Sequence, residues 1–253
     1  MTTDLQKASL SKRIAAGILD AMLLCVLAVG AAALLTWLFG YEGHSTALEQ
    51  AYNHYETQYG VEFNISQEQF DAMDASQQAN FNAAYEALIH DDDAMYHYNM
   101  VVNLTLLVTT FSILLAIVVL EFVVPLLLKN GQTVGKKVFS LGLMRTDAVQ
   151  VTPVQLFARA ILGKFTIEIM ISVYILILIF FNSIGITGPL VIGGILITQI
   201  ICLAVTRTNS MIHDLLSGTV VVDISSQKIF RTSQDLLEYQ KQIAAEQARR
   251  QNY

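Results

Sequence analysis

The chain has 253 residues, of which 54% are hydrophobic and only 14% are charged. About a quarter of the residues in an ordinary soluble domain are charged, so this composition argues against one. The net charge is -6 and no basic face forms on a soluble domain, which excludes a nucleic-acid-binding protein and leaves no nucleic-acid partner to expect.

Four long apolar segments predict four membrane-spanning helices. A helix needs roughly 20 residues to cross ~30 Å of hydrocarbon, and each segment approaches or exceeds that length. A removable signal peptide competes for the first segment, but its apolar part is longer than that class allows and contains Asp20. We therefore expect a retained helix. The segments are residues 14–39, 100–128, about 165–181 and 189–206, and the last two are joined by a turn over 182–188.

Basic residues are confined to three parts of the chain. Three lie before residue 14, six between 129 and 164, and six after 206, while none lies between Ile14 and Leu128. Loops rich in Lys and Arg stay in the cytoplasm. We therefore expect a multi-pass protein of the cell membrane with both termini in the cytoplasm.

The segment over residues 40–98 is the one sizeable extracytoplasmic region in this topology. It carries eleven Asp and Glu residues, and Ser66 to Gln69 has the pattern of a capping box, so we expect a small helical insertion. His90, Asp92 and His97 could collect a cation through clustered oxygen and imidazole groups. A solvated helix end is the simpler interpretation, and it leaves the insertion with no metal.

Each spanning segment contains one polar residue in its cytoplasmic third. Counted at 1.5 Å per residue, these residues lie ~6–12 Å inside the membrane edge. Ionisable residues in a membrane are costly and are functional candidates by default. Glu121 and Glu168 would repel each other if both were ionised, and burial adds to that effect. The four candidates for ion coupling are Asp20, Glu121, Glu168 and Gln199.

A structural interpretation of the same residues stays open. Arg13 lies two helical turns before Asp20 on the same helix face and could bend back toward it. Arg159 and Lys164 could likewise pair with the carboxylates and fix helix packing. The structural interpretation and the transport interpretation are compatible at Asp20.

The segment between the second and third spans predicts two further elements. Residues 138–146 and 218–223 are short and rich in β-branched or apolar residues, so we expect two strands that pair beneath the membrane. Residues 153–163 predict a helix in the membrane interface, with Arg159 and Lys164 near lipid phosphates. The segment 130–137 fails the phosphate-loop spacing, so we expect no nucleotide and no other cofactor.

Three sequence blocks resemble the RDD family of membrane proteins, which is named for one arginine and two aspartates. Arg13 and Asp20 match the first helix, and Asp214, preceded by His213, matches the second aspartate. A central G-Q-T-x-G-K block is also present, although Ala148 replaces a glycine found in many members. The resemblance implies a membrane protein for which transport is proposed, with some members described as sodium/proton antiporters. The central block is Gly131, Gln132, Thr133, Gly135 and Lys136.

Together these observations predict an all-α membrane protein with four transmembrane helices, a small helical extracytoplasmic insertion and a short cytoplasmic β-strand pair. The expected order is an N-terminus and first span (1–39), the insertion (40–98), the second span (99–128), a basic loop with the interfacial helix (129–164), a hairpin of the third and fourth spans (165–206), a segment with the His213–Asp214 pair and a strand (207–232), and a helical tail (233–253).

Two functions remain in competition. The first is a cation/proton exchanger or small-ligand transporter that handles Na⁺ or H⁺ as a homo-oligomer or with a membrane-protein partner. The second is a non-transporting scaffold or accessory subunit of a larger membrane complex. An enzyme is not expected, because His213 and Asp214 have no accompanying nucleophile or metal ligands.

Overall fold

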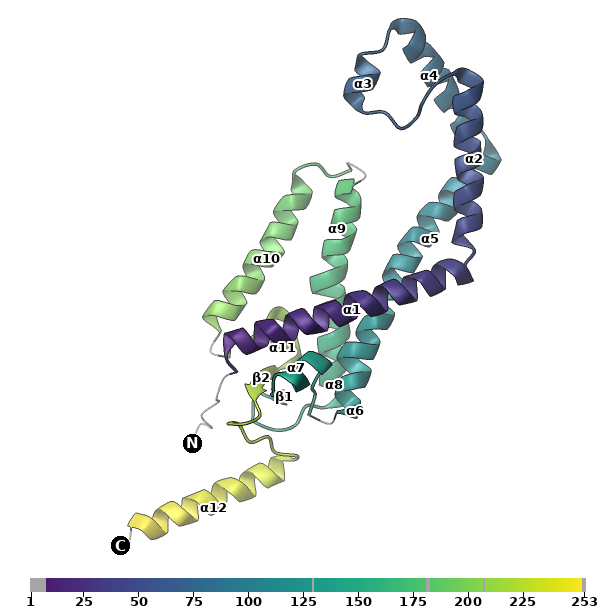
Figure 1. Ribbon diagram of the computed structural model, residues 1–253. Coiled ribbons are helices and arrows are strands. Elements are labelled where there is room, and N and C mark those ends of the chain that lie inside the picture. The colour runs from purple at the N-terminus through teal and green to yellow at the C-terminus, as the bar shows by residue number, and fades with distance from the viewer. Residues whose placement is uncertain (1–7, 129, 181–182, 207, 252–253) are drawn as a thin grey trace. The chain divides into compact units, whose positions relative to one another are not determined.

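The computed structural model describes residues 8–128, 130–180, 183–206 and 208–251 (Figure 1). Residues 1–7 of the predicted N-terminal segment, Lys129 of the basic loop, Asn182 of the predicted turn, Arg207 and the end of the tail lie outside that description. The chain divides into two compact units. One comprises the chain up to Ala28 together with everything from Ile113 onward, and the other is Val29–Ser112.

Among the residues that the structure describes, four helices are long and apolar enough to cross a membrane, as the sequence predicted. The first is α1 (Leu10–Leu38) and the fourth is α10 (Thr187–Val205). The second, Asp92–Leu127, consists of α5 (Asp92–Ile117), a π-helical stretch (Val118–Val123) and α6 (Val124–Leu127). The third, Pro153–Phe180, consists of α8 (Pro153–Phe157), a π-helical stretch (Ala158–Met170) and α9 (Ile171–Phe180).

The predicted strand pair is confirmed in the first unit. β1 (Leu141–Arg145) and β2 (Thr219–Asp223) are antiparallel, with Leu141 opposite Asp223 and Arg145 opposite Thr219. Three further helices belong to this unit. They are α7 (Val134–Val138), α11 (Ile212–Ser217) and the largely exposed α12 (Ser233–Gln251), which forms the predicted tail.

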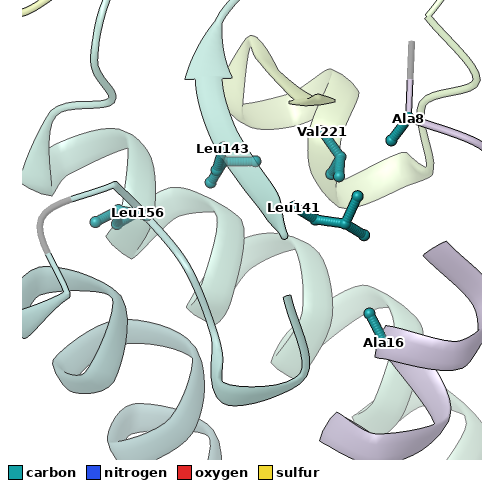
Figure 2. Packing of buried hydrophobic residues seen from close by; sticks show 6 residues of the cluster. All are labelled: Ala8, Ala16, Leu141, Leu143, Leu156 and Val221. Atoms are coloured by element: carbon teal, nitrogen blue, oxygen red, sulfur yellow. The ribbon is translucent and has the colours of Figure 1, made fainter. Parts of the chain in front are cut away.

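Both faces of the strand pair are buried, which explains why its residues are apolar without alternation. Successive side chains of a strand point to opposite faces. On one face, Leu141, Leu143 and Val221 pack with Leu156 of α8 and with Ala8 and Ala16 at the start of the chain (Figure 2). On the other face, the cluster contains Met144, Ala148, Val220, Val222 and Phe230.

Ala148 adopts a backbone conformation that usually requires glycine. Its φ is 67°, and its side chain is fully buried in the second cluster. Its backbone N–H donates to the carbonyl of Arg145, and its carbonyl accepts from Phe230. The turn after β1 therefore holds the left-handed conformation in spite of the missing glycine.

The second unit contains the predicted helical insertion. Its helices are α2 (Tyr41–Tyr59), α3 (Gln67–Asp71), α4 (Ala75–Ile89) and the first part of α5. The predicted capping box is present, since Ser66 accepts from the N–H of Gln69, and Asp74 makes a second one at α4. Gly40 and Gly60, both with φ near 65°, lie at the two ends of α2.

Residues 153–163, which the sequence predicts as an interfacial helix, are helical but are continuous with the third span. The helix from Pro153 runs without a break into the third span and ends at Phe180. Thr152 caps its start through the N–H of Gln155. The charges of Arg159 and Lys164 suggested an interfacial position, but both find carboxylate partners within the fold. The second span also begins earlier than predicted, at Asp92 instead of residue 99 or 100.

Candidate functional site

Two π-helical stretches of the first unit carry four of the charged side chains that form ion pairs there. Glu121 lies on the first, and Arg159, Lys164 and Glu168 lie on the second. In a π-helical turn the N–H bonds to the carbonyl five residues back, as Ile171 does to Thr166. Such turns are rare in proteins overall, but those that occur are often found at functional sites. They redirect side chains at a cost in helix stability.

Asp214 is the centre of the network. Its side chain is fully buried and lies between two arginines. Oδ1 is 3.0 Å from Nε of Arg159, and Oδ2 is 3.2 Å from Nη2 of Arg13. Arg13 also donates from Nη1 to the carbonyl of Thr208. These contacts join α1, the third span and α11, and they compensate the cost of burying the charges.

Glu121 is the second buried carboxylate. Oε1 accepts a hydrogen bond from Nζ of Lys164, and Oε2 lies 3.6 Å from Nη1 of Arg159. Oε2 accepts no hydrogen bond from the described residues, although it is shielded from solvent. Glu121 therefore has two cations beside it and one oxygen with unused acceptor capacity.

Asp20 is enclosed by the loop that precedes β1. Oδ2 accepts from the hydroxyl of Thr133 at 2.5 Å, and Oδ1 accepts from the N–H of Gly135 at 2.7 Å. Nζ of Lys136 lies 3.9 Å from Oδ2 and donates to Oγ1 of Thr133 at 3.1 Å. Thr133 thus links a buried carboxylate to a buried ammonium group.

Glu168 forms a separate branch of the network. Oε1 lies 2.8 Å from Nδ1 of His213 and accepts from the N–H of the same residue at 3.1 Å. Gln199 of the fourth span bonds to Glu168 and accepts from the N–H of Ile212. Nε2 of His213 lies 3.5 Å from Oδ1 of Asp214, which connects this branch to the centre.

Burial and charge shift the pKa values of the network residues that lie outside the spans. Burial lowers the pKa of Lys136 to about 7, because Glu121 and Asp20 offset the loss of hydration only in part. Burial also lowers the pKa of His213. Burial alone would raise the pKa of Asp214, but the positive charges around it hold that pKa well below its usual range.

The sequence profile of one membrane-protein family, the RDD family, matches residues 7–218. This range covers most of the chain and includes the whole charge network. The chain belongs to the RDD family. No curated protein and no solved structure matches it.

The three residues that name the RDD family do not all contact one another. Arg13 binds Asp214, whereas Asp20 binds Thr133 and Gly135. The alternative in which Arg13 bends back to Asp20 on the same helix is therefore wrong. The arginine reaches a residue 201 positions away, and the nearer aspartate is satisfied by the central loop.

The central block of the RDD pattern has a structural explanation at each position that it fixes. Gly131 has φ 61°, and a Cβ there would lie 2.8 Å from Val151. Gln132 donates to the carbonyl of Leu141, which holds the loop to β1. A Cβ on Gly135 would lie 2.9 Å from the Asp20 carboxyl group, so only glycine allows this approach. Thr133 and Lys136 supply the polar contacts to Asp20.

Of the four predicted ion-coupling residues of this RDD protein, Glu121, Glu168 and Gln199 belong to one network of ion pairs and hydrogen bonds. Asp20 lies in a separate cluster with Thr133, Gly135 and Lys136, which is coupled to Glu121 through the charge of Lys136.

Glu121 and Glu168, which are expected to repel each other if both are ionised, lie beside different basic partners in the structure. The expectation that Arg159 lies near lipid phosphates is wrong, since its side chain is 4% exposed and binds Asp214. Lys164 is 19% exposed and binds Glu121.

The three residues of the insertion that could collect a cation, His90, Asp92 and His97, are not brought together. His90 lies beside Glu86 on its own helix, and His97 lies 3.0 Å from His44, measured between their Nδ1 atoms. Among the residues that the structure describes, no three His, Cys, Asp or Glu side chains are placed to hold a metal ion. Asp92 is exposed and belongs to no such group.

The burial of Lys136 beside Asp20 does not follow from its place in the family block. The available signal is the pair of adjacent lysines, Lys136 and Lys137, in the short helix α7, because neighbouring residues of a helix point in different directions. In the structure Lys136 is buried and Lys137 is exposed.

Proposed function

We propose that this RDD protein exchanges a monovalent cation such as Na⁺ for a proton across the cell membrane, with Asp20 and Lys136 at the exchange centre. The observation that carries the proposal is the burial of this pair. Each side chain is 8% exposed, Nζ lies 3.9 Å from Oδ2, and the two groups share the hydroxyl of Thr133.

Charge balance supports an exchange in a one-to-one ratio. The network contains four carboxylates and four basic side chains that carry a charge when His213 is neutral. A metal cation that enters beside Asp20 would leave one buried positive charge in excess, and an unpaired buried charge is costly. Release of one proton restores the balance. The network consists of Asp20, Glu121, Glu168 and Asp214 with Arg13, Lys136, Arg159 and Lys164.

Lys136 is the group best suited to release that proton. Arginine stays protonated in proteins, so Arg13 and Arg159 keep their charges. Burial lowers the pKa of Lys136 to about 7, which lets this ammonium group lose its proton near neutral pH. Its position 3.9 Å from Asp20 couples its charge directly to the proposed cation site.

The positive-inside pattern gives the proposed orientation, with the network near the cytoplasmic side and both termini in the cytoplasm. Four helices scarcely enclose a pathway by themselves. We therefore propose a homo-oligomer or a complex with another membrane protein as the active form.

The test is flux in proteoliposomes that contain a pH-sensitive dye, with a Na⁺ gradient imposed across the membrane. We expect Asp20→Asn and Lys136→Arg to abolish the pH change, because the first removes the cation site and the second removes the releasable proton. Lys137→Arg changes the exposed neighbour and should leave flux unaltered. Equal flux in the wild type and Lys136→Arg would contradict the mechanism.

The stoichiometry gives a separate test. A one-to-one exchange moves no net charge, so an imposed membrane potential should not change the initial rate. A rate that rises with the potential would contradict the charge-balance argument.

A scaffold or accessory subunit is the second candidate, and the pairing within the network favours it. Each buried carboxylate has a basic partner or several hydrogen bonds, so the network can act purely to join helices. This function predicts a stable partner in mild-detergent purification and no flux. Clear flux from the protein purified without a partner would exclude it.

A further inference from the structure

The second unit contains a cavity of about 850 Å³. Cavities of ~300–1,000 Å³ are typical of small-molecule sites. The cavity lies between α2, α3, α4 and the first part of α5, and its wall residues are different from those of the charge network. Its wall comprises Leu48, Tyr52, Glu56, Phe63, Asn64, Ile65, Ser66, Gln67, Phe70, Phe81, Asn82, Tyr85, Leu88, Ile89, Ala94, Met95 and Tyr98.

Aromatic rings form a large part of this wall. Phe63 packs edge-to-face on Tyr52 and Phe81, with centroids 5.8 and 5.7 Å apart, and Phe70 packs on Phe81 at 5.2 Å. Tyr85 is 51% exposed, so its ring surface remains accessible beside the packed rings. The packed rings come from α2, the segment after it, α3 and α4, and they give the wall a defined shape.

The charge of the cavity is negative. Glu56 is in the wall, and its Oε1 accepts from the N–H of Phe63 at 2.7 Å, which fixes the carboxylate in place. Residues 40–98 carry eleven acidic side chains, and the chain has no Lys or Arg between Ile14 and Leu128. An anionic ligand would therefore meet only repulsion, whereas a cationic ligand has both a carboxylate and aromatic rings to bind.

We propose that this cavity binds an organic cation, namely an amine or quaternary ammonium compound with an apolar body. Aromatic faces attract ammonium groups through the ring quadrupole, and aromatic cages are a common solution for quaternary ammonium ligands. The apolar body would pack against Leu48, Leu88 and Ile89. Asn64, Ser66, Gln67 and Asn82 offer neutral hydrogen-bonding groups at the wall.

In the orientation proposed above, the insertion that forms the cavity lies outside the cell. The cavity is a different site from the exchange centre, and it would bind its ligand whether or not Asp20 and Lys136 carry out exchange. Failure of one proposal therefore leaves the other standing.

The test uses the full chain in lipid nanodiscs and isothermal titration calorimetry with benzyltrimethylammonium as the probe. The comparison compounds are its uncharged carbon analogue, neopentylbenzene, and the anion benzoate. We expect saturable binding of the cation, at least fivefold weaker binding of the neutral compound and no binding of benzoate. Empty nanodiscs provide the background.

Two substitutions with matched controls locate the site. Glu56→Gln keeps an acceptor for the Phe63 N–H but removes the charge, and it should weaken binding at least fivefold. Glu62→Gln removes an exposed charge of the same segment outside the wall and should have no effect. Tyr85→Leu should weaken binding two- to fivefold, whereas Tyr96→Leu should not.

Absence of saturable cation binding would overturn the proposal. Equal binding of the neutral compound would also overturn it, because the cavity would then be an apolar site that suits a lipid chain. Equal effects of Glu56→Gln and Glu62→Gln would show that only the general negative field attracts the probe, and this too would refute the assigned site.

Discussion

Arg159 directs both Nε and Nη2 to the same oxygen of Asp214, each at 3.0 Å. Neither side chain is more than 4% exposed. The second oxygen of Asp214 binds Arg13 from the first helix. One carboxylate therefore holds together three segments that are far apart in the sequence, and loss of its charge should affect all three.

Asp214→Asn should strongly destabilise the protein. Removal of one partner from a buried ion pair typically costs about 3–5 kcal/mol, because the remaining charges stay buried without compensation. Here two arginines would be left. We expect a lower midpoint of thermal unfolding in detergent or loss of the monodisperse species in size-exclusion chromatography.

The partly exposed pair of Lys12 and Asp223, in which the Asp223 side chain is 15% exposed, is the control for this prediction. Nζ of Lys12 lies 2.6 Å from Oδ2 of Asp223, but the Lys12 side chain is 44% exposed. Exposed ion pairs contribute about 1 kcal/mol or less. If Asp223→Asn lowers the midpoint of thermal unfolding as much as Asp214→Asn does, burial does not determine the cost of removing the carboxylate charge.

Gly163→Ala should destabilise the contact between the third span and α11. A Cβ at this position would lie 2.5 Å from Cβ and 2.7 Å from Cα of His213. Insertion of a methyl group into such a contact costs about 1–3 kcal/mol. Gly193→Ala is the matched control, because a Cβ there meets no atom within 4 Å and alanine favours a helix by ~1 kcal/mol. Equal midpoints of thermal unfolding for Gly163→Ala and Gly193→Ala would show that the contact with His213 is less tight than the structure indicates.

The helices and the strand pair could be predicted from the sequence because local patterns specify them. An apolar run such as that of α10 suffices to predict a span, and residues 141–145 have the length and composition of a strand. α2 was not predicted as one long helix, because its apolar residues are spaced irregularly among polar ones.

The partners in the charge network could not be predicted in the same way. Arg13 and Asp214 are 201 residues apart, and helical periodicity within α1 favoured the nearer Asp20 instead. The π-helical stretches are a second reason. Counting residues at the α-helical rise gives the depth of Glu121 or Arg159 only when the helix is regular, and both residues lie on stretches that are not.

Lys136→Met should change how stability depends on pH. Burial lowers the pKa of Lys136 to about 7 in the folded protein, whereas lysine in an unfolded chain has a pKa near 10.4. Between these values the unfolded state binds more protons, so the contribution of Lys136 to stability rises with pH. This contribution is complete above pH ~10.4 and is lost as the pH falls to about 7.

Thermal midpoints of the wild type and Lys136→Met between pH 6 and 10 provide the measurement. Methionine is apolar, has a similar length and does not titrate. We expect the wild type to gain stability relative to the variant as the pH rises from 7. Parallel curves would show that Lys136 keeps an ordinary pKa, and the exchange mechanism would lose its proton donor.

Thr133→Val should disturb the loop around Asp20, whereas Thr133→Ser should not. The hydroxyl donates to Oδ2 of Asp20 and accepts from the backbone N–H and the Nζ of Lys136. Valine has nearly the same shape but leaves these buried groups unsatisfied, at a cost of about 1–3 kcal/mol. Serine keeps the hydroxyl group. Proteolysis of the loop before β1 measures the effect directly, and cleavage of Thr133→Val no faster than that of Thr133→Ser would show that the hydroxyl does not hold the loop around Asp20.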